Sequence, residues 1–193
     1  MASKDRLSGI GERINVRLTL LEEALGMTPG DSEIYSKWIA SKAPEPELGE
    51  EETAAVEGTE QPEDATTCFP RTEDGVPFCW DYQIKGFFKD ACSSLRRVPC
   101  TRSSKLTAFK KVIDGTIFIE QRAIPLRASS ASGERVALAA SETVPAGTVL
   151  EFSILVMNPK DAETVREWLD YGRLRGLFQW RNSGKGRFEW EEV

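Results

Sequence analysis

The 193-residue chain contains no histidine, and this absence excludes more kinds of function than any other feature of its composition. Imidazole is the side chain whose ordinary pKa lies nearest to neutral pH, and many enzymes use it as a general base or proton shuttle. Catalysis by a Ser-His-Asp or a Cys-His arrangement is therefore excluded, as are the common mononuclear zinc sites that include histidine.

The sequence also has few signals of export, membrane insertion or metal binding. The charged start at Met1–Arg6 leads into no apolar run typical of a secretory signal, and no window approaches the ~20 apolar residues of a membrane helix. The cysteines at 68, 79, 92 and 100 form no Cys-x-x-Cys pair. We expect reduced cysteines, no metal, no cofactor, no membrane contact and a cytoplasmic location.

The overall composition is typical of a globular protein, but the charge is unevenly distributed along the chain. Apolar residues make up 40% and charged residues 29% of the chain, and its length suits a single domain over residues 1–193. Residues 43–64 hold nine acids and no base, and their removal changes the net charge from −6 to +3. We expect residues 43–68 to be a disordered acidic insertion, because this composition buries too little apolar surface to fold.

Alternation of apolar and polar side chains is the main strand signal. It predicts half-buried strands at 13–20 and 150–156. Weaker strand patterns follow at 112–119, 124–126, 135–141, 177–181 and 187–190.

Spacings of three and four between apolar residues predict the helices. The first long helix covers 82–97, with Asp81 as its cap, and the second runs from Asn158-Pro159 to about Gly172. A short helix is expected at 32–39. The order of elements predicts an α+β fold with a ferredoxin-like (βαββαβ) core, a mostly antiparallel sheet, two long helices and an inserted hairpin.

Positive charge is concentrated on and after the first long helix. Eight basic residues and one acid lie between positions 83 and 111, and some of them repeat at helical spacing. Lys and Arg side chains contact phosphate groups, so the pattern indicates a surface for polyanions; a solvated helix face is the alternative. The candidate binding residues are Lys85, Lys89, Arg96, Arg97, Arg102, Lys105, Lys110 and Lys111.

The segment from Tyr171 to Trp190 is the second candidate, because it combines glycine, arginine and aromatic residues. Glycine allows a ligand or a neighbouring chain to come close, and the aromatic rings suit stacking or the core. The candidate cations are Arg181, Lys185 and Arg187, and the candidate glycines are Gly176, Gly184 and Gly186. For Phe178, Phe188 and Trp190 we favour a place in the core.

Two segments resemble the repeat-associated mysterious protein (RAMP) superfamily, which forms backbone and guide-RNA-processing subunits of CRISPR effector complexes. Residues 82–89, Tyr-Gln-Ile-Lys-Gly-Phe-Phe-Lys, resemble the start of the family's first helix. Residues 176–188 resemble its glycine-rich loop, with Phe178 where that loop often has glycine. The chain also looks similar to uncharacterised phage and prophage proteins. The resemblance implies a ferredoxin-like fold, and binding and assembly rather than cleavage, since the histidine of many RNA-cleaving members is absent.

We therefore expect a non-catalytic protein of phage or prophage type that binds RNA or single-stranded DNA and assembles as a homo-oligomer. One alternative is a phage interaction protein that binds or inhibits a host defence complex through its acidic stretch or its basic face. A second alternative is a histidine-free nuclease, and a metal-dependent one would need acids clustered in a cleft.

Overall fold

The computed structural model describes residues 9–29, 67–128 and 141–193 of the chain. The predicted helix at 32–39, the acidic stretch at 43–64 and almost all of the predicted strand at 135–141 lie outside these ranges.

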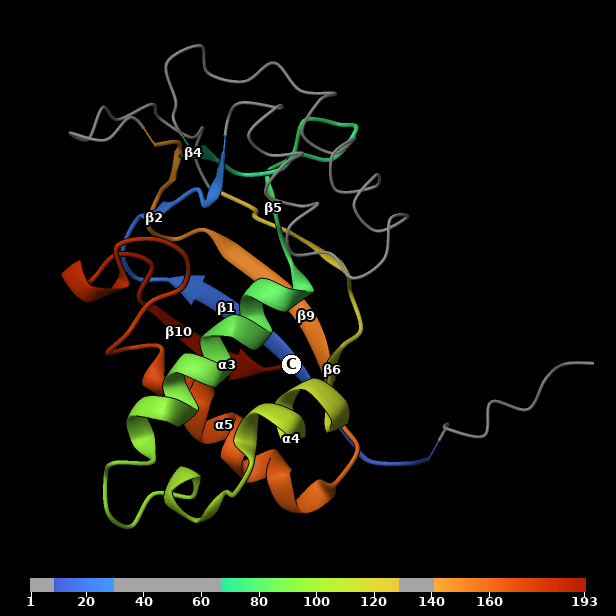
Figure 1. Ribbon diagram of the computed structural model, residues 1–193. Coiled ribbons are helices and arrows are strands. Elements are labelled where there is room, and N and C mark those ends of the chain that lie inside the picture. Colours follow the sequence, from blue (N-terminus) through green and yellow to red (C-terminus); the bar gives the residue numbers. More distant parts are fainter. Residues whose placement is uncertain (1–8, 30–66, 129–140) are drawn as a thin grey trace, which may run out of the picture.

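A four-stranded antiparallel sheet lies at the centre of the fold, in the order β10-β1-β9-β6 (Figure 1). Its strands are β1 (Glu12–Leu20), β6 (Ile117–Ile119), β9 (Val149–Val156) and β10 (Phe188–Glu192). In β1 and β9 every second side chain is buried, as the alternating sequence requires. The strands predicted at 13–20, 150–156 and 187–190 are confirmed.

The connections between these strands give the ferredoxin-like order. From β1 the chain passes through helices to β6, and β9 lies between these two strands. From β9 it passes through another helix to β10, on the far side of β1. In order of appearance the sheet therefore reads 4-1-3-2, and the predicted α+β class with a βαββαβ core is confirmed.

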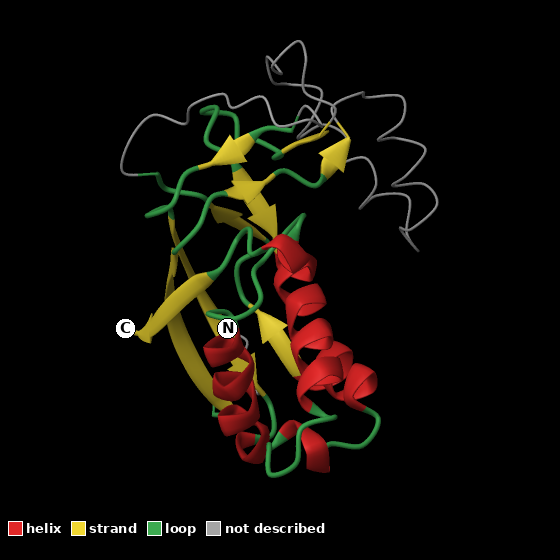
Figure 2. Ribbon diagram, turned by 90° about the vertical axis from the view of Figure 1, so that its left-hand side faces the viewer, coloured by secondary structure: helices red, strands yellow, loops and turns green. Residues whose placement is uncertain are grey.

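Among the described residues three α-helices cover one face of this sheet (Figure 2). They are α3 (Asp81–Leu95), α4 (Phe109–Thr116) and α5 (Ala162–Tyr171), with short 3-10 turns η1 (Ser103–Lys105), η2 (Pro159–Asp161) and η3 (Arg181–Ser183). The apolar side of α3 buries Ile84, Phe87 and Phe88. The ring of Phe88 lies 5.5 Å from that of Trp168 on α5, so the two predicted helices share one core.

Short two-stranded sheets lie beyond the central sheet. They pair β2 (Ala24–Leu25) with β8 (Thr143–Val144), β3 (Thr28–Pro29) with β4 (Thr67–Cys68), and β5 (Phe78–Trp80) with β7 (Ala123–Pro125). Strand β7 corresponds to the prediction at 124–126. Thr67 and Cys68, the last two residues of the expected acidic insertion, belong to β4, where Cys68 is buried.

The predicted strand at 112–119 is wrong over residues 112–116, which belong to helix α4. The β-branched residues Val112, Ile113 and Thr116 favour a strand in isolation. In the fold Ile113 is completely buried in the core, and the hydroxyl of Thr116 donates a 2.7 Å hydrogen bond to the carbonyl of Val112, one turn earlier. Tertiary packing therefore outweighs local preference, and β6 begins only at Ile117.

Two smaller expectations are also corrected. Asp81 is the first residue of α3 rather than its cap, and the side-chain oxygen of Gln83 accepts the Trp80 N–H at 2.9 Å. The strand expected at 177–181 is an irregular loop, because Phe178 and Trp180 have φ values of 65° and 56°. Left-handed backbone of this kind is incompatible with a strand.

The cysteines provide a chemical test of this fold. All four are reduced thiols; Cys68, Cys79 and Cys92 are buried and Cys100 is exposed. Burial raises the pKa of the Cys79 and Cys92 thiols, so little thiolate forms at these positions. We expect Ellman's reagent to modify Cys100 rapidly in native protein and the other thiols only after unfolding.

The matched control is Cys100→Ser, which should remove the rapid phase without changing the slow one. Rapid modification of a second thiol in the native variant would contradict the packing described here.

Candidate nucleic-acid interface

The basic residues that follow α3 gather at one end of the molecule, where the chain passes through η1 to α4 (Figure 1). We call residues 96–111 the basic segment. No Asp or Glu occurs between positions 91 and 113. The segment contains six predicted binding residues, all exposed: Arg96, Arg97, Arg102, Lys105, Lys110 and Lys111. A surface of this kind attracts polyanions.

A carboxylate of α5 holds the basic segment in place. Glu167 accepts hydrogen bonds from the backbone N–H groups of Arg102 at 2.7 Å and Ser103 at 3.0 Å, and from the Ser103 hydroxyl at 2.6 Å. That hydroxyl accepts a 2.9 Å bond from the indole N–H of Trp168, which is completely buried. Glu167 thus satisfies the free N–H groups at the start of η1, and Ser103 connects this cap to the core.

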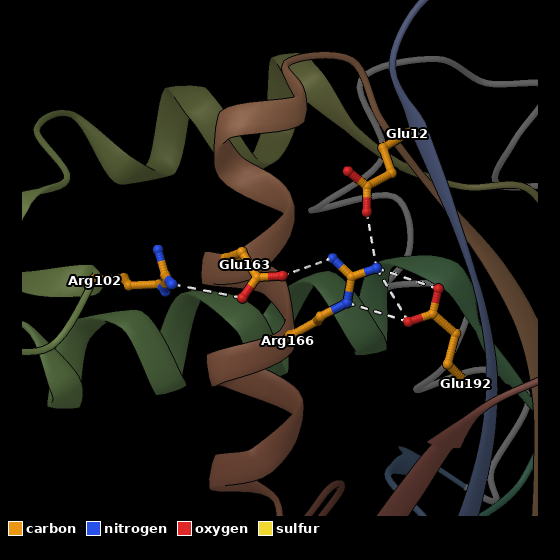
Figure 3. A network of polar contacts seen from close by, with 5 residues as sticks. All are labelled: Glu12, Arg102, Glu163, Arg166 and Glu192. Atoms are coloured by element: carbon orange, nitrogen blue, oxygen red, sulfur yellow. Dashed lines mark hydrogen bonds and ion pairs between the residues drawn. The ribbon is translucent and has the colours of Figure 1, made fainter.

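Arg166 connects the same region to the sheet (Figure 3). Its guanidinium lies 2.8 Å from a carboxylate oxygen of Glu12 on β1 and 3.1 Å from one of Glu192 on β10. Glu163 lies 3.1 Å from Arg166 and 3.5 Å from Arg102 of the basic segment. These side chains join two neighbouring strands, α5 and the basic segment in one network.

The predicted cations on α3 lie against α4 and β6. The Lys85 ammonium is 4.9 Å from the centre of the Phe118 ring, a distance typical of a cation–π contact. Lys89 forms an ion pair of 2.6 Å with Asp114 of α4. The side of α3 that carries these cations therefore borders α4 and the edge strand β6.

The candidate cations of the C-terminal loop are paired with acids of the fold. Arg181 lies 3.5 Å from Asp90, Arg187 lies 2.9 Å from Glu22, and Lys185 pairs with Glu23. Their side chains are also less exposed than most of those in the basic segment. The loop is thus less strongly positive than its sequence suggests.

The glycines of this loop allow it to pack against itself. A Cβ on Gly176 would lie 2.0 Å from the carbonyl oxygen of Lys185, and one on Gly186 would lie 2.3 Å from that of Leu177. Gly184 has a φ of 83°, which favours glycine. The close approach expected from the sequence is therefore made within the loop. Phe178 and Phe188 are buried in the core, as we favoured for them.

The face of the central sheet opposite the helices carries both signs of charge. Arg13 lies 2.7 Å from Glu120, and Arg17 lies 2.8 Å from Glu151 and 3.1 Å from Glu191. Because these charges compensate one another, this face lacks the positive excess of the basic segment.

The described part of the chain holds no group of three or more Asp, Glu or Cys side chains that could bind a metal ion. In the same ranges, no helix combines the length and apolar character needed to cross a membrane.

The sequence contains no signal for the residues that position the basic segment. Glu163 and Glu167 occur on α5 at the spacing of ordinary surface acids. Their partners Arg102 and Ser103 lie about 60 positions away in the chain, and only the packing of α5 beside η1 brings them together.

Replacement of Glu167 tests the anchor. Glu167→Ala leaves the N–H groups of Arg102 and Ser103 without their acceptor, so we expect the free energy of unfolding to fall by about 1–3 kcal/mol. Chemical denaturation followed by tryptophan fluorescence measures the change. Glu189→Ala removes only the exposed 3.2 Å pair with Arg173 and should cost at most about 1 kcal/mol. Equal losses in the two variants would show that Glu167 is no anchor.

Comparison of the sequence with protein-family models and with curated proteins gives no match. Solved structures match at the level of fold. The protein is similar to a chain of the type III-B Cmr-beta complex bound to cognate target RNA, with a TM-score of 0.51 and 13% identity. That match covers 98% of this chain and 62% of the other, so the protein spans less than two thirds of the length of that subunit.

Two further structures belong to complexes or subunits of the same kind. One is a chain of a type IV-B CRISPR complex, with a TM-score of 0.48, 11% identity and coverage of 94% of this chain and 90% of that chain. The other is Cmr4 (Cas7) of Pyrococcus furiosus, with a TM-score of 0.42, 12% identity and coverage of 94% and 100%. The predicted likeness to RAMP subunits of CRISPR complexes is thus confirmed for the fold, on the Cmr-beta match.

Proposed function

We propose that the protein binds RNA or single-stranded DNA without cleaving it, and that the basic segment is its main contact with the phosphate backbone. The observation that carries this proposal is the stretch of residues 91–113, which has six exposed cations and no acid in a protein of net charge −6. Cations gathered in this way repel one another, and a polyanion relieves that repulsion.

The acids nearest to the basic segment leave most of its charge available. Glu167 is occupied by backbone N–H groups and by Ser103. Glu163 lies 3.5 Å from Arg102, in a pair whose side chains are 54% and 57% exposed. An exposed pair of this kind contributes at most about 1 kcal/mol, so a phosphate group can replace Glu163 as the partner of Arg102.

We further infer that copies of the chain assemble side by side on the nucleic acid. Support comes from the fold shared with the Cmr-beta chain, whose complex was determined with bound target RNA. The proposal includes no catalytic step, because the chain lacks histidine and the described residues offer no metal-binding cluster. The C-terminal loop as a second contact, the phage origin and the cytoplasmic location remain predictions from the sequence.

Charge reversal in the basic segment tests the assignment of the surface. We expect Lys105→Glu combined with Lys110→Glu to weaken binding of a fluorescent single-stranded oligonucleotide by at least about tenfold at moderate salt. The slope of log Kd against log salt should fall by about 1–2, because fewer counterions are released on binding. Fluorescence anisotropy at several salt concentrations measures both quantities.

The matched control is Arg127→Glu combined with Arg173→Glu, which changes the net charge equally at two exposed positions outside the segment. It should bind nearly as well as the parent protein. If both double variants lose affinity to the same extent, net charge rather than the basic segment governs binding.

Size-exclusion chromatography with absorbance at 260 and 280 nm tests assembly. We expect freshly purified protein to elute as a high-mass species rich in 260 nm absorbance, and nuclease treatment to convert it to smaller species. A single low-mass peak, unchanged when an oligonucleotide is added, would contradict assembly on nucleic acid.

A further inference from the structure

The acidic stretch at 43–64 has no role in the function proposed above, although it dominates the charge of the chain. It holds nine carboxylates and no base, and these nine acids change the net charge from +3 to −6. Carboxylates at this density repel one another, and contact with cations relieves that repulsion. The stretch therefore favours contact with a surface that is rich in Lys and Arg.

The basic segment is the surface of this protein whose charge matches the acidic stretch. It has six exposed cations, and residues 91–113 contain no Asp or Glu. The arginines of the open sheet face and the cations of the C-terminal loop form ion pairs with acids of the fold. A flexible run of carboxylates thus gains most at the basic segment, which is also the surface that we assign to nucleic acid.

The length of the chain allows the two to meet within one copy. Strands β3 and β4 place Pro29 opposite Thr67, at the end of the molecule away from the basic segment (Figure 1). The helix α3, which runs between these ends, has 15 residues and is therefore about 22 Å long. Glu52 precedes Thr67 by 15 positions, which span up to about 50 Å when extended. The central acids of the stretch thus have enough chain to reach the basic segment.

We propose that the acidic stretch is an intramolecular competitor of nucleic acid, which binds the basic segment of its own copy until a polyanion displaces it. The inference rests on the proposed function and adds how that site is regulated. Because both partners belong to one chain, the effective concentration of the acidic stretch at the basic segment is on the order of millimolar. Ion pairs that are weak between separate molecules are therefore populated within the chain.

The competition sets a threshold for binding. A long strand carries a phosphate on every nucleotide, so it makes more contacts than the acidic stretch and displaces it. Short oligonucleotides and small anions compete poorly. If the acidic stretch occupies the basic segment for about 75–90% of the time, the apparent affinity for nucleic acid falls by about 4–10-fold. Salt screens exposed charges, so this difference should disappear as the salt concentration rises.

The test replaces the nine acids by their amides, with Glu→Gln at the eight glutamates of 43–64 and Asp64→Asn. This amide variant should bind a fluorescent oligonucleotide about 4–10-fold more tightly than the parent protein at low salt. The control repeats the replacement in protein that carries Lys105→Glu and Lys110→Glu. There the gain should shrink to less than about twofold, because the competitor has lost its site. An equal gain in both backgrounds would show that net charge alone acts, and would refute the competition.

Carbodiimide crosslinking tests the contact itself, without nucleic acid. The reagent joins carboxylates to lysine amines that touch them, and mass spectrometry identifies the linked peptides. We expect the acidic stretch to be linked to Lys105, Lys110 or Lys111, and the links to be lost when an oligonucleotide is added. In a mixture of ¹⁵N-labelled and unlabelled protein, each link should join peptides of one label. Links between the two labels, or equal linkage to Lys85 and Lys185, would overturn the proposal.

The outcomes distinguish this inference from the function on which it rests. If neither the parent protein nor the amide variant binds an oligonucleotide at low salt, the proposed function fails. If both bind with the same affinity and the acidic stretch forms no link to the basic segment, the proposed function stands and the intramolecular competitor is refuted.

Discussion

The hydrogen bonds from the backbone of Arg102 and Ser103 to Glu167 fix the part of the molecule on which its chemistry depends. The segment between α3 and α4 contains many like charges and little apolar surface, so it has no reason of its own to adopt one shape. The carboxylate of Glu167, which belongs to α5, supplies the contacts that hold the segment in one conformation. Because the segment is already ordered, a ligand that binds to it does not have to order it, and less binding energy is lost.

Three consecutive residues of α5 stabilise three different parts of the fold. Arg166 contacts the strands β1 and β10, Glu167 contacts the basic segment, and Trp168 fills the core while donating to Ser103. Successive residues of a helix point in directions about 100° apart, so one turn reaches three neighbours. A change in the tilt or rotation of α5 would therefore disturb its contacts with the sheet, the core and the basic segment together.

Positive charge serves two purposes in this protein, and its placement decides which. Arg181, Lys185 and Arg187 are paired with acids on distant parts of the chain, and these pairs fasten the C-terminal loop to α3 and to the end of β1. The cations of the basic segment lie in a stretch, residues 91–113, that contains no Asp or Glu. A count of Lys and Arg in the sequence treats both groups alike, which is why both the loop and the segment were candidates.

The elements that were predicted correctly from the sequence are those determined by residues close together in the chain. In β1 and β9 the alternation of side chains is the cause of the strand. Asn158 with Pro159 begins the 3-10 turn η2, which leads directly into α5, the second predicted helix. Helix α4 was missed because Ile113 gains more from the core than its β-branched neighbours gain from a strand. The anchor at Glu167 and the pairing of Asp90 with Arg175 and Arg181 join residues more than 60 positions apart, and no local pattern contains them.

The position of β1 in the middle of the sheet has a consequence for how the protein is made. A ribosome completes β1 by residue 20, but its two neighbours begin only at residues 149 and 188. The backbone edges of β1 therefore stay without their native partners while well over a hundred further residues are synthesised. Contacts this distant in sequence form slowly. The nascent chain thus exposes an unpaired strand during most of its synthesis. In this period it is most prone to aggregation and depends most on chaperones.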